Sequence, residues 1–327
     1  MTALLITVDT ELSALLHQRG LGLDDNVRCS IWGEAQGRGY GIGWQMDQLD
    51  RHGLKGVFFV DPMPAAIHGT EFLKPIVAAI VGRGHEVQLH VHTEWLGRGS
   101  RSPVGGRQGR NIGDFSLDDQ VALLRTAREW LEEAGAPAVT AFRAGNFGAN
   151  DDTLRALAQL GITWDSSLNP AYRRHGCSLA ATVGDQAGIV RRLGVAELPV
   201  AGICDRPGSF RPAQVCAMSA AEMRAGLRHA VREGHEAFAL VTHSFEMLSR
   251  DRRRPNRAVM RRFTALCREA ATLGGVRTAG FNDLSPDLGQ RDACPPARLS
   301  SSRWRTSARI AQQVWATWRY ERRLIPA

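Results

Sequence analysis

Acidic, imidazole and guanidinium side chains follow directly after short apolar runs at five places along the chain. These residue types suit general acid–base catalysis and the binding of a divalent metal. An aspartate after a strand is most often a turn or capping residue, and a single histidine there is most often structural. The recurrence at five strand ends is what favours a functional site. The five groups are Asp9 with Glu11, His90 with His92 and Glu94, Arg143 with Asn146, Asp165, and His243.

Short apolar segments alternate with longer segments of helical periodicity as far as residue 278. This alternation, repeated in about seven βα units with no break in composition, predicts an α/β barrel, closed or nearly closed, with helices outside a parallel sheet. The carboxyl ends of the strands carry the active site in such barrels. No dinucleotide-binding or phosphate-binding glycine motif is present. The predicted strands are 4–8, 56–60, 86–91, 138–142, 162–164, 237–242 and 275–278, and the predicted helices are 42–49, 71–82, 117–134, 151–160, 219–233 and 256–273.

Three connecting segments are expected to lack regular structure. A glycine-rich loop is predicted after the first strand. Residues 96–114 are rich in glycine and arginine and have no apolar periodicity, so we expect a long surface loop there. Residues 170–207 are predicted to be irregular. The barrel topology would place the last two segments over the mouth of the barrel.

The order of these motifs resembles that of the polysaccharide deacetylase family, the NodB-type carbohydrate esterases. The resemblance covers roughly residues 4–280. It implies a deformed (β/α)7 TIM-like barrel and an enzyme that uses a divalent metal to remove acyl groups from N-acylated sugars. The matching segments are Thr7–Glu11, Gly53–Val60, Gly84–Glu94, Phe142–Gly145, Asp165 and Leu240–His243.

The resemblance also implies roles for four catalytic residues. Hydrolysis of an amide needs an activated water, a group that stabilises the oxyanion and an acid for the leaving amine. Asp9 would be the general base, and Arg143 would orient that carboxylate and keep it ionised. His243 would protonate the departing amine, and Asp165 would tune or orient the acidic pair.

The predicted metal ligands depart from the family pattern. Many members have two adjacent aspartates in the first motif and His-x-x-x-His in the second, whereas this chain has Asp9-x-Glu11 and His90-x-His92-x-Glu94. His90 occupies the position of the first histidine and Glu94 that of the second. His92 competes with Glu94, and Glu11 is a further predicted ligand, because residues two apart on a strand share a face. This donor set suits zinc, and manganese, iron or cobalt would also fit.

The substrate is predicted from the residues beside these motifs. Trp95, Asn146 and Phe147 are the predicted substrate-binding residues, because aromatic rings at such positions commonly stack on sugars. We expect an N-acetylated sugar or a glycoconjugate precursor, nucleotide-linked or lipid-linked, as the substrate of an N-deacetylase. The alternatives are a ring-opening amidohydrolase that acts on a cyclic amide and a non-catalytic saccharide-binding protein.

Composition places the chain among globular proteins. Of its 327 residues, 43% are hydrophobic and 23% are charged, which excludes a disordered chain. The six cysteines form no C-x-x-C pair, so no zinc knuckle or disulfide framework is indicated. The chain opens on a strand-like run rather than a signal peptide, and no run could span a bilayer, so we expect a cytoplasmic protein. We predict a catalytic barrel over residues 1–290 and a linker with a basic helical tail over 291–327.

The formal charge of +8 belongs mainly to that tail. From Arg298 onward the chain holds seven arginines and one acid, Glu321. An apolar stripe with helical spacing predicts that residues 303–323 contact the barrel or a second subunit, with an anionic membrane surface as the alternative. The body of the chain is nearly neutral and carries no nucleic-acid-recognition motif, which argues against nucleic acid as a partner. The stripe consists of Trp304, Ala308, Ala311, Trp315 and Trp318.

Overall fold

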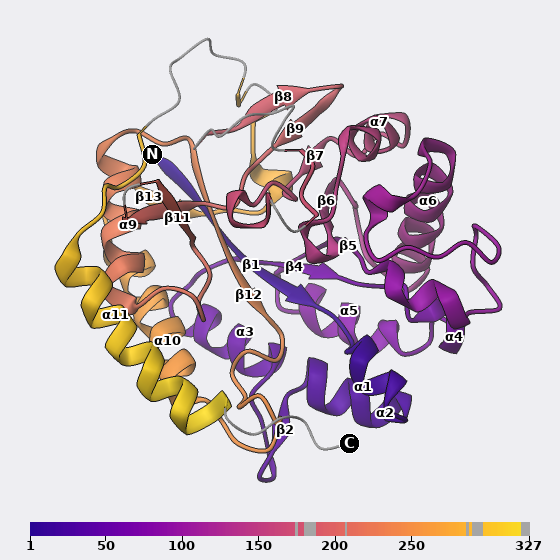
Figure 1. Ribbon diagram of the computed structural model, residues 1–327, viewed down its shortest axis with the longest axis horizontal. Coiled ribbons are helices and arrows are strands. Elements are labelled where there is room, and N and C mark those ends of the chain that lie inside the picture. Colours follow the sequence, from indigo (N-terminus) through magenta and orange to yellow (C-terminus); the bar gives the residue numbers. More distant parts are fainter. Residues whose placement is uncertain (174–175, 180–187, 207, 286–287, 290–296, 322–327) are drawn as a thin grey trace. The chain divides into compact units, whose positions relative to one another are not determined.

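The computed structural model describes residues 1–173, 176–179, 188–206, 208–285, 288–289 and 297–321 (Figure 1). The chain forms two compact units. Unit 1 consists of Met1–Gly56, Ala201–Thr278 and Ala297–Ala327, and unit 2 of Val57–Val200 and Ala279–Pro296. Both units contain parallel strands and helices, as the α/β prediction requires. The predicted boundary at residue 290 lies outside the described residues and stays a prediction.

Unit 1 is organised around a long strand, β1 (Thr2–Thr10). The strand β12 (Ala237–His243) pairs with it in parallel along one edge, and β13 (Val276–Thr278) pairs in parallel along the other (Figure 1). The apolar run in β1 is fully buried, which explains why it carries no polar alternation. Asp9 stands directly opposite His243 in the strand register, so two of the predicted strand-end residues meet here.

The helices of unit 1 confirm the predicted periodicity. The predicted helices 42–49, 219–233 and 256–273 are found as α3 (Ile42–Arg51), α9 (Ala220–Arg232) and α10 (Arg257–Thr272). Ser219 begins α9 with a capping box, because its hydroxyl accepts from the Glu222 amide while the Glu222 carboxylate accepts from the Ser219 amide.

The segment between β1 and α3 was predicted to be a glycine-rich loop, and that prediction was wrong. It folds into α1 (Ala14–Gln18), α2 (Leu23–Asn26), a π-helical turn over Val27–Ile31 and a hairpin of β2 (Glu34–Ala35) and β3 (Arg38–Gly39). The buried Asn26 side chain organises this insertion, because its amide bonds the backbone of Ser13 in both directions. Such a long-range bond leaves no trace in local periodicity.

The tail forms the predicted helix, α11 (Arg303–Ala316), followed by a π-helical turn over Thr317–Glu321. It packs beside α9 and the hairpin of β10 (Gly202–Arg206) and β11 (Ser209–Pro212) (Figure 1). The apolar stripe was expected to make this contact within the chain, but it faces outward. The buried side of α11 instead consists of Thr306, Arg309 and Ala316, with Tyr320 beyond it.

An ion-pair network explains this reversal. The Arg309 guanidinium is 2% exposed and donates to the Asp205 carboxylate at 2.8 Å and to the Glu222 carboxylate at 3.0 Å. Two buried acids and one arginine therefore hold the helix in place, a partnership between distant segments that the stripe did not predict.

Unit 2 is built on a second set of strands. In spatial order they are β4 (Gly56–Val60), β5 (Glu86–Val91), β6 (Ala141–Ala144), β7 (Trp164–Asp165) and β9 (Val195–Glu197), all parallel, with β8 (Val190–Arg192) antiparallel at the edge. The predicted limits of β4 and β5 are confirmed. The expectation of irregular structure over 170–207 was wrong where β8, β9 and β10 form.

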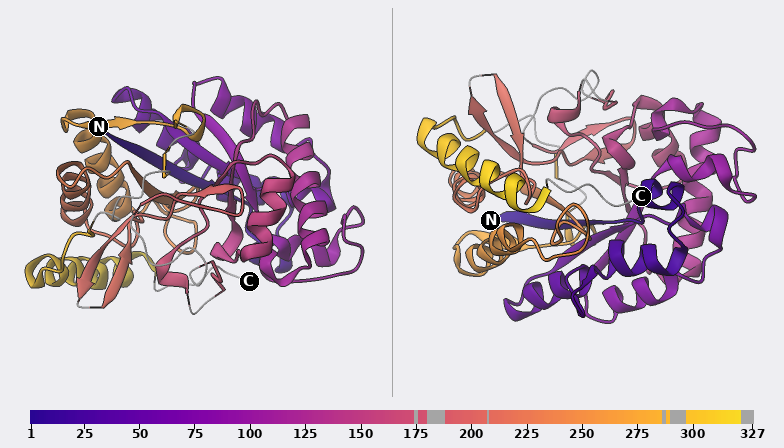
Figure 2. Two further views of the ribbon diagram at one scale, coloured as in Figure 1. Left: turned by 90° about the horizontal axis from the view of Figure 1, so that it is seen from above. Right: turned by 60° about the horizontal axis from the view of Figure 1, so that its bottom comes forward.

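The helices of unit 2 are α4 (Ala65–His68), α5 (Leu73–Val81), α6 (Leu117–Glu133) and α7 (Asp151–Gln159) (Figure 2). Ser116 and Asn150 cap the last two with side-chain hydrogen bonds. The predicted loop 96–114 contains 3-10 turns over Thr93–Arg98 and Ile112–Asp114, and it buries Leu96, Val104 and Ile112. It is therefore a packed segment rather than a purely solvated one.

No helix among the described residues is both long enough and apolar enough to cross a bilayer.

Candidate active site

In unit 1, a carboxylate and an imidazole meet at the carboxyl ends of two paired strands. Asp9 is the last residue but one of β1 and is 2% exposed. Its Oδ2 lies 3.9 Å from Nε2 of His243, the last residue of β12. Glu11 follows just beyond β1 and is partly exposed. Unit 1 thus carries the predicted base, the predicted acid and one predicted metal ligand.

Glu246 fixes the other side of the His243 ring. His243 Nδ1 lies 2.8 Å from Glu246 Oε1, three residues further along the chain. The same carboxylate accepts hydrogen bonds from the Gln214 amide at 3.0 Å and the Thr242 hydroxyl at 2.9 Å. Gln45 donates to the His243 carbonyl at 2.9 Å. These bonds leave the ring little freedom to turn and direct Nε2 toward Asp9.

The acidic surroundings decide the charge of this histidine. Burial by itself lowers the pKa of His243, but the hydrogen bond and the negative charge of Glu246, with Asp9 and Glu11 adding to them, raise it to about 9. The protonated ring in turn lowers the pKa of Glu246, although burial opposes this. At neutral pH His243 is therefore an imidazolium that can give up a proton.

In unit 2, two histidines lie together at the end of β5. The rings of His90 and His92 are nearly perpendicular, with centroids 4.9 Å apart. His90 Nδ1 lies 2.7 Å from the Arg143 carbonyl, and His92 Nδ1 lies 3.0 Å from Glu94 Oε2. Because these oxygens accept hydrogen bonds, Nδ1 carries the proton in each neutral ring and the lone pair lies on Nε2. This arrangement is typical of metal-ligating histidines.

Glu94 is engaged by neighbours within its own unit. Its Oε1 accepts from the Asn146 amide at 2.8 Å, and its Oε2 contacts His92. Burial raises the pKa of Glu94, but the bonds from His92 and Asn146 outweigh it and lower the pKa overall. The carboxylate thus orients His92, which resembles the carboxylate–histidine pairs found behind metal sites.

The backbone next to Asn146 is strained. Asn146 and Phe147 both have φ of +55°, a left-handed conformation that non-glycine residues seldom adopt. The preceding Gly145 is obligatory for another reason, since a Cβ there would lie 2.8 Å from the His92 ring and 2.7 Å from the Val91 carbonyl. The turn after β6 therefore brings the Asn146 amide to Glu94 and leaves room for His92.

Arg143 is completely buried on β6. Its guanidinium donates to the Ser166 carbonyl and hydroxyl at 3.1 Å each and lies 4.2 Å from the centre of the Phe59 ring. These contacts hold the cation in one orientation at the end of the strand, as a positioning role would require.

Asp165 pairs with an acid that the sequence did not indicate. It stands opposite Glu197 in the register of β7 and β9, and the Ser167 hydroxyl donates to it at 2.5 Å. Burial and the adjacent Asp165 charge raise the pKa of Glu197 well above its usual range. Burial raises the pKa of Asp165 as well, so both carboxyls of this pair hold a proton more tightly than free acids do.

The three predicted substrate-binding residues lie in unit 2. Trp95 and Phe147 are 2% and 6% exposed, and the Phe147 ring packs on Tyr172 with centroids 5.0 Å apart. The Asn146 amide is bonded to Glu94. Asn146 is thus linked to His92 through Glu94, and contact of all three side chains with a sugar stays a prediction.

Two functional candidates were missed by the motif analysis. Glu246 follows His243 by three residues, so a search for acids just after a strand-end histidine would have found it. Glu197 is 32 residues from Asp165 in sequence, and only the pairing of β7 with β9 brings them together.

No protein-family model and no curated protein sequence matches this chain. Solved structures do. The chain is 20% identical to a protein from Mycobacterium smegmatis assigned to the polysaccharide deacetylases, over 90% of this chain and 93% of that one, with a TM-score of 0.56. Two family 4 carbohydrate esterases also align. The Streptomyces lividans enzyme, in complex with acetate, is 11% identical over 91% and 97% of the two chains, with a TM-score of 0.41. The acetyl xylan esterase of Clostridium thermocellum, with a cobalt ion, is 12% identical over 84% and 87%, with a TM-score of 0.39.

The first of these likenesses shows the fold. The chain has the α/β barrel fold of the polysaccharide deacetylases, and the resemblance drawn from the motifs is confirmed at that level.

Proposed function

We propose that this chain is a metal-dependent N-deacetylase of an N-acetylated saccharide. The observation that carries the proposal is the arrangement of Glu246, His243 and Asp9, in which a buried carboxylate lies beside an imidazolium. One group can take a proton and the other can give one, which is what hydrolysis of an amide demands. The fold shared with polysaccharide deacetylases supports the same reaction class.

The residues would divide the reaction as follows. Asp9 accepts a proton from the attacking water while the oxygen of that water bonds to the amide carbon. His243 then donates the Nε2 proton to the sugar nitrogen as the carbon–nitrogen bond breaks, releasing acetate and a free amine. Arg143 would orient the base, and Asp165 would tune or orient the acidic pair.

A divalent metal fits the donor set of unit 2. His90 and His92 would hold it through Nε2, because their Nδ1 atoms are committed to oxygen acceptors. Glu11 is a proposed carboxylate ligand, and Glu94 would orient His92 or bind directly. A bound zinc, manganese, iron or cobalt ion would polarise the amide carbonyl and acidify the attacking water. Imidazole and carboxylate donors favour zinc among these.

The direct test measures acetate released from N-acetylglucosamine oligomers and from nucleotide-linked and lipid-linked N-acetyl sugars, with each metal in turn. Asp9→Asn and His243→Ala should each lower turnover by about 10²- to 10⁴-fold. Asp24→Asn and His52→Ala remove the same groups elsewhere in unit 1 and should have no effect. Circular dichroism spectra of all four variants check that they fold.

The same experiment separates the alternatives. Wild-type turnover in either Asp9→Asn or His243→Ala would refute the role given to that residue. Hydrolysis of cyclic amides, without acetate release, would indicate a ring-opening amidohydrolase. Saccharide binding by metal-replete protein that releases no acetate would indicate a non-catalytic binding protein.

We further propose that the protein works in the cytoplasm at an anionic membrane surface, and that α11 makes this contact. With its buried side against unit 1, the helix presents Trp304, Val314, Trp315 and Trp318 outward at 88%, 66%, 51% and 60% exposure. An exposed apolar face of this kind generally marks an interaction surface. Tryptophan is also favoured at the boundary between lipid and water.

The charge beside this face indicates its partner. A cavity of about 430 Å³ next to Trp315 is lined by Arg254, Arg257, Arg261 and Arg319. Among the described residues, none of these four arginines lies within 4.0 Å of a carboxylate. A second copy would bring the same cations against them, whereas anionic lipid headgroups would neutralise them.

Sedimentation with vesicles tests this contact. Binding is expected to phosphatidylglycerol-containing vesicles and not to pure phosphatidylcholine. Arg257→Gln with Arg261→Gln should weaken it by about 2 kcal/mol, roughly thirtyfold. Trp315→Ser with Trp318→Ser should also weaken it, whereas Arg224→Gln with Arg268→Gln should not. Absence of binding to anionic vesicles, or self-association or DNA binding that uses the same residues instead, would overturn the proposal.

A further inference from the structure

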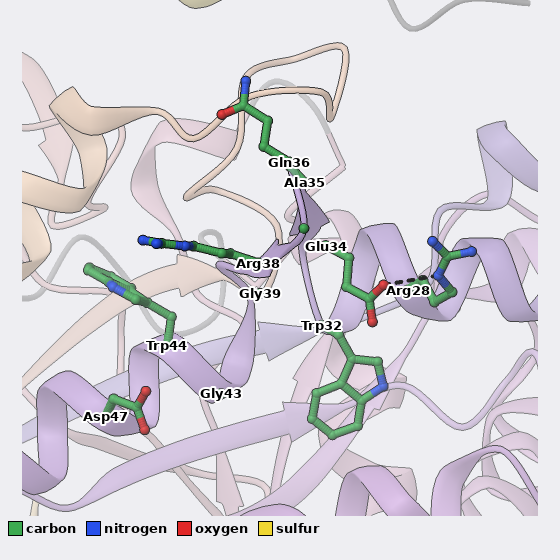
Figure 3. Close-up of a pocket in the computed structure, with 11 residues that line it drawn as sticks. Arg28, Trp32, Glu34, Ala35, Gln36, Arg38, Gly39, Gly43, Trp44 and Asp47 are labelled. Atoms are coloured by element: carbon green, nitrogen blue, oxygen red, sulfur yellow. Dashed lines mark hydrogen bonds and ion pairs between the residues drawn. The ribbon is translucent and has the colours of Figure 1, made fainter.

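The insertion between β1 and α3 encloses a cavity that none of the catalytic residues lines. It has a volume of about 680 Å³, within the range of small-ligand sites. Its walls come from the π-helical turn, the β2–β3 hairpin and the first turns of α3 (Figure 3). The cavity belongs entirely to unit 1 and shares one lining residue, Gln36, with the arginine-lined cavity beside α11.

Two tryptophans give this cavity flat apolar surfaces. Trp32, directly after the π-helical turn, and Trp44, on α3, line it, and both are partly exposed (Figure 3). The Trp44 ring also packs on Phe263 with centroids 5.9 Å apart, so its position is fixed. Gly39 and Gly43 line the space as well and add no side chain to fill it.

The polar lining is balanced in charge. Arg28 and Arg38 face the cavity together with Glu34 and Asp47, and Gln36 reaches it from the hairpin turn. Arg28 is already neutralised by Glu34 at 3.0 Å and by Asp25 at 3.0 Å. Two cations and two anions do not select a phosphate or a polyanion. Planar hydrogen-bonding groups around aromatic rings suit the hydroxyls and the apolar faces of a neutral sugar.

The hairpin that carries these groups is held in shape. Gly41 N–H donates to the Trp32 carbonyl at 2.8 Å, and Tyr40 N–H donates to the Gly33 carbonyl at 3.0 Å. Gln36 and Gly37 form its two-residue turn with φ of +53° and +73°. A left-handed glutamine costs free energy that asparagine or glycine would avoid, and strain of this kind gathers at functional sites.

We propose that this cavity binds one neutral pyranose ring of an oligosaccharide, at a position removed from the reacting N-acetyl sugar. Trp44 and Trp32 would stack on the ring, and Arg38, Gln36 and Asp47 would bind its hydroxyls. The link to a longer substrate rests on the proposed deacetylase function, but the sugar site itself does not.

Filling the cavity is the sharpest test. Gly43 lies in α3, and a Cβ added there meets no atom within 4 Å. Gly43→Leu should therefore extend into the cavity from an unobstructed Cβ, and loss of a helical glycine should stabilise the fold by up to about 1 kcal/mol. Gly274→Leu is the matched control, since Gly274 also has open space around it.

Calorimetry and tryptophan fluorescence would measure binding of N-acetylglucosamine tetramer and cellotetraose. We expect Gly43→Leu and Trp44→Ala to raise the Kd about tenfold or more, and Gly274→Leu to leave it unchanged. Gly43→Leu should also raise the KM for the tetramer. Thermal unfolding of Gly43→Leu at or above the wild-type temperature would exclude misfolding as the cause.

The proposal would be overturned if the tetramers bind wild type and Gly43→Leu equally. It would also be overturned if only anionic saccharides bind, or if no saccharide binds at all. The outcomes also separate it from the catalytic proposal. Tetramer binding lost in Gly43→Leu, without deacetylation of any substrate, would uphold the cavity and refute the enzyme. If the protein deacetylates a substrate and Gly43→Leu binds the tetramers as well as wild type does, the enzyme is upheld and the sugar-binding cavity is refuted.

Discussion

His243 and Glu246 form a hydrogen-bonded pair, with Nδ1 of the imidazole 2.8 Å from Oε1 of the carboxylate. The pair sits at the end of β12, and the far nitrogen of the ring points to Asp9 at 3.9 Å. Glu246 thereby determines both the orientation and the charge of the proposed acid. It touches no reacting atom in the proposed mechanism, so it is a positioning residue.

The first prediction concerns pH. Because the pKa of His243 is raised to about 9, its proton is present below that pH and is lost as the pH rises through it, so activity should fall above about pH 9. Glu246→Gln removes the charge that raises this pKa, and the alkaline limb should move toward the ordinary histidine value. At pH 8 the variant should lose roughly tenfold in turnover beyond any loss at pH 6.

Two measurements check this shift, namely the pH–rate profile and an NMR titration of the His243 ring. Glu236→Gln, which replaces an acid outside the described His243 contacts, serves as the control. A Glu246→Gln profile with an unmoved alkaline limb would show that Glu246 has only a structural role.

The second prediction concerns metal affinity. Glu94→Gln keeps the shape of the side chain but weakens its hold on His92 Nδ1, so zinc affinity should fall by about 10- to 100-fold. Calorimetric titration of zinc into chelator-treated protein measures it without reference to activity. His92→Ala should lose more than Glu94→Gln if the imidazole is the ligand. A greater loss in Glu94→Gln would make the carboxylate the ligand.

A third prediction follows from the close packing at Gly145. Gly145→Ala would bring a methyl group within 2.8 Å of the His92 ring, so the ring or the backbone must shift. We expect a stability loss of about 1–3 kcal/mol together with weaker zinc binding. Gly106→Ala, where a Cβ meets nothing within 4 Å, should change neither. Unaltered zinc binding in Gly145→Ala would show that His92 takes no part in the metal site.

The Asp165–Glu197 pair leads to a fourth prediction. Burial and Asp165 raise the pKa of Glu197 in the folded protein, so Glu197 holds its proton to higher pH there than in the unfolded chain. Its contribution to stability is therefore lost as the pH rises above the unfolded value. Glu197→Gln cannot ionise, so its free energy of unfolding should exceed that of the wild type by more at pH 8 than at pH 5.

Urea denaturation at the two pH values provides the measurement. The control is Glu129→Gln, which replaces an exposed acid on α6. Its free energy of unfolding should differ from that of the wild type by the same amount at both pH values. A pH-independent effect of Glu197→Gln would mean that Glu197 is ionised in the folded protein.

The fifth prediction concerns the attachment of α11. Arg309→Met leaves the Glu222 and Asp205 carboxylates without their shared buried cation and should cost about 3–5 kcal/mol in unfolding free energy or release the helix. Arg303→Met, on the exposed side of the same helix, should stay within about 0.5 kcal/mol of wild type. Chemical denaturation and limited proteolysis of the tail distinguish the two. Equal stability of both variants would show that the network does not anchor the helix.

The sequence by itself determined some of the strands, whereas β6 and β7 lie two to three residues from their predicted starts and β8 to β11 were not predicted. The segments 56–60 and 86–91 predicted β4 and β5 to the residue, because their apolar residues must be buried in a parallel sheet. The same rule placed Asp9 and His243 at strand ends. β5 also buries the polar side chains of Glu86, Gln88 and His90. The start of α6 at Leu117 was also predicted, since its cap, Ser116, is recognised by a contact between residues three apart.

Only the tertiary structure decided which side chains partner one another. Glu197 reaches Asp165 through strand pairing, and Arg309 reaches Asp205 across about a hundred residues, so no local pattern could report either pair. The tryptophan stripe of α11 predicted a buried face by hydrophobicity alone. The helix turned the other way, because a buried guanidinium that satisfies two carboxylates must face the segments that supply them.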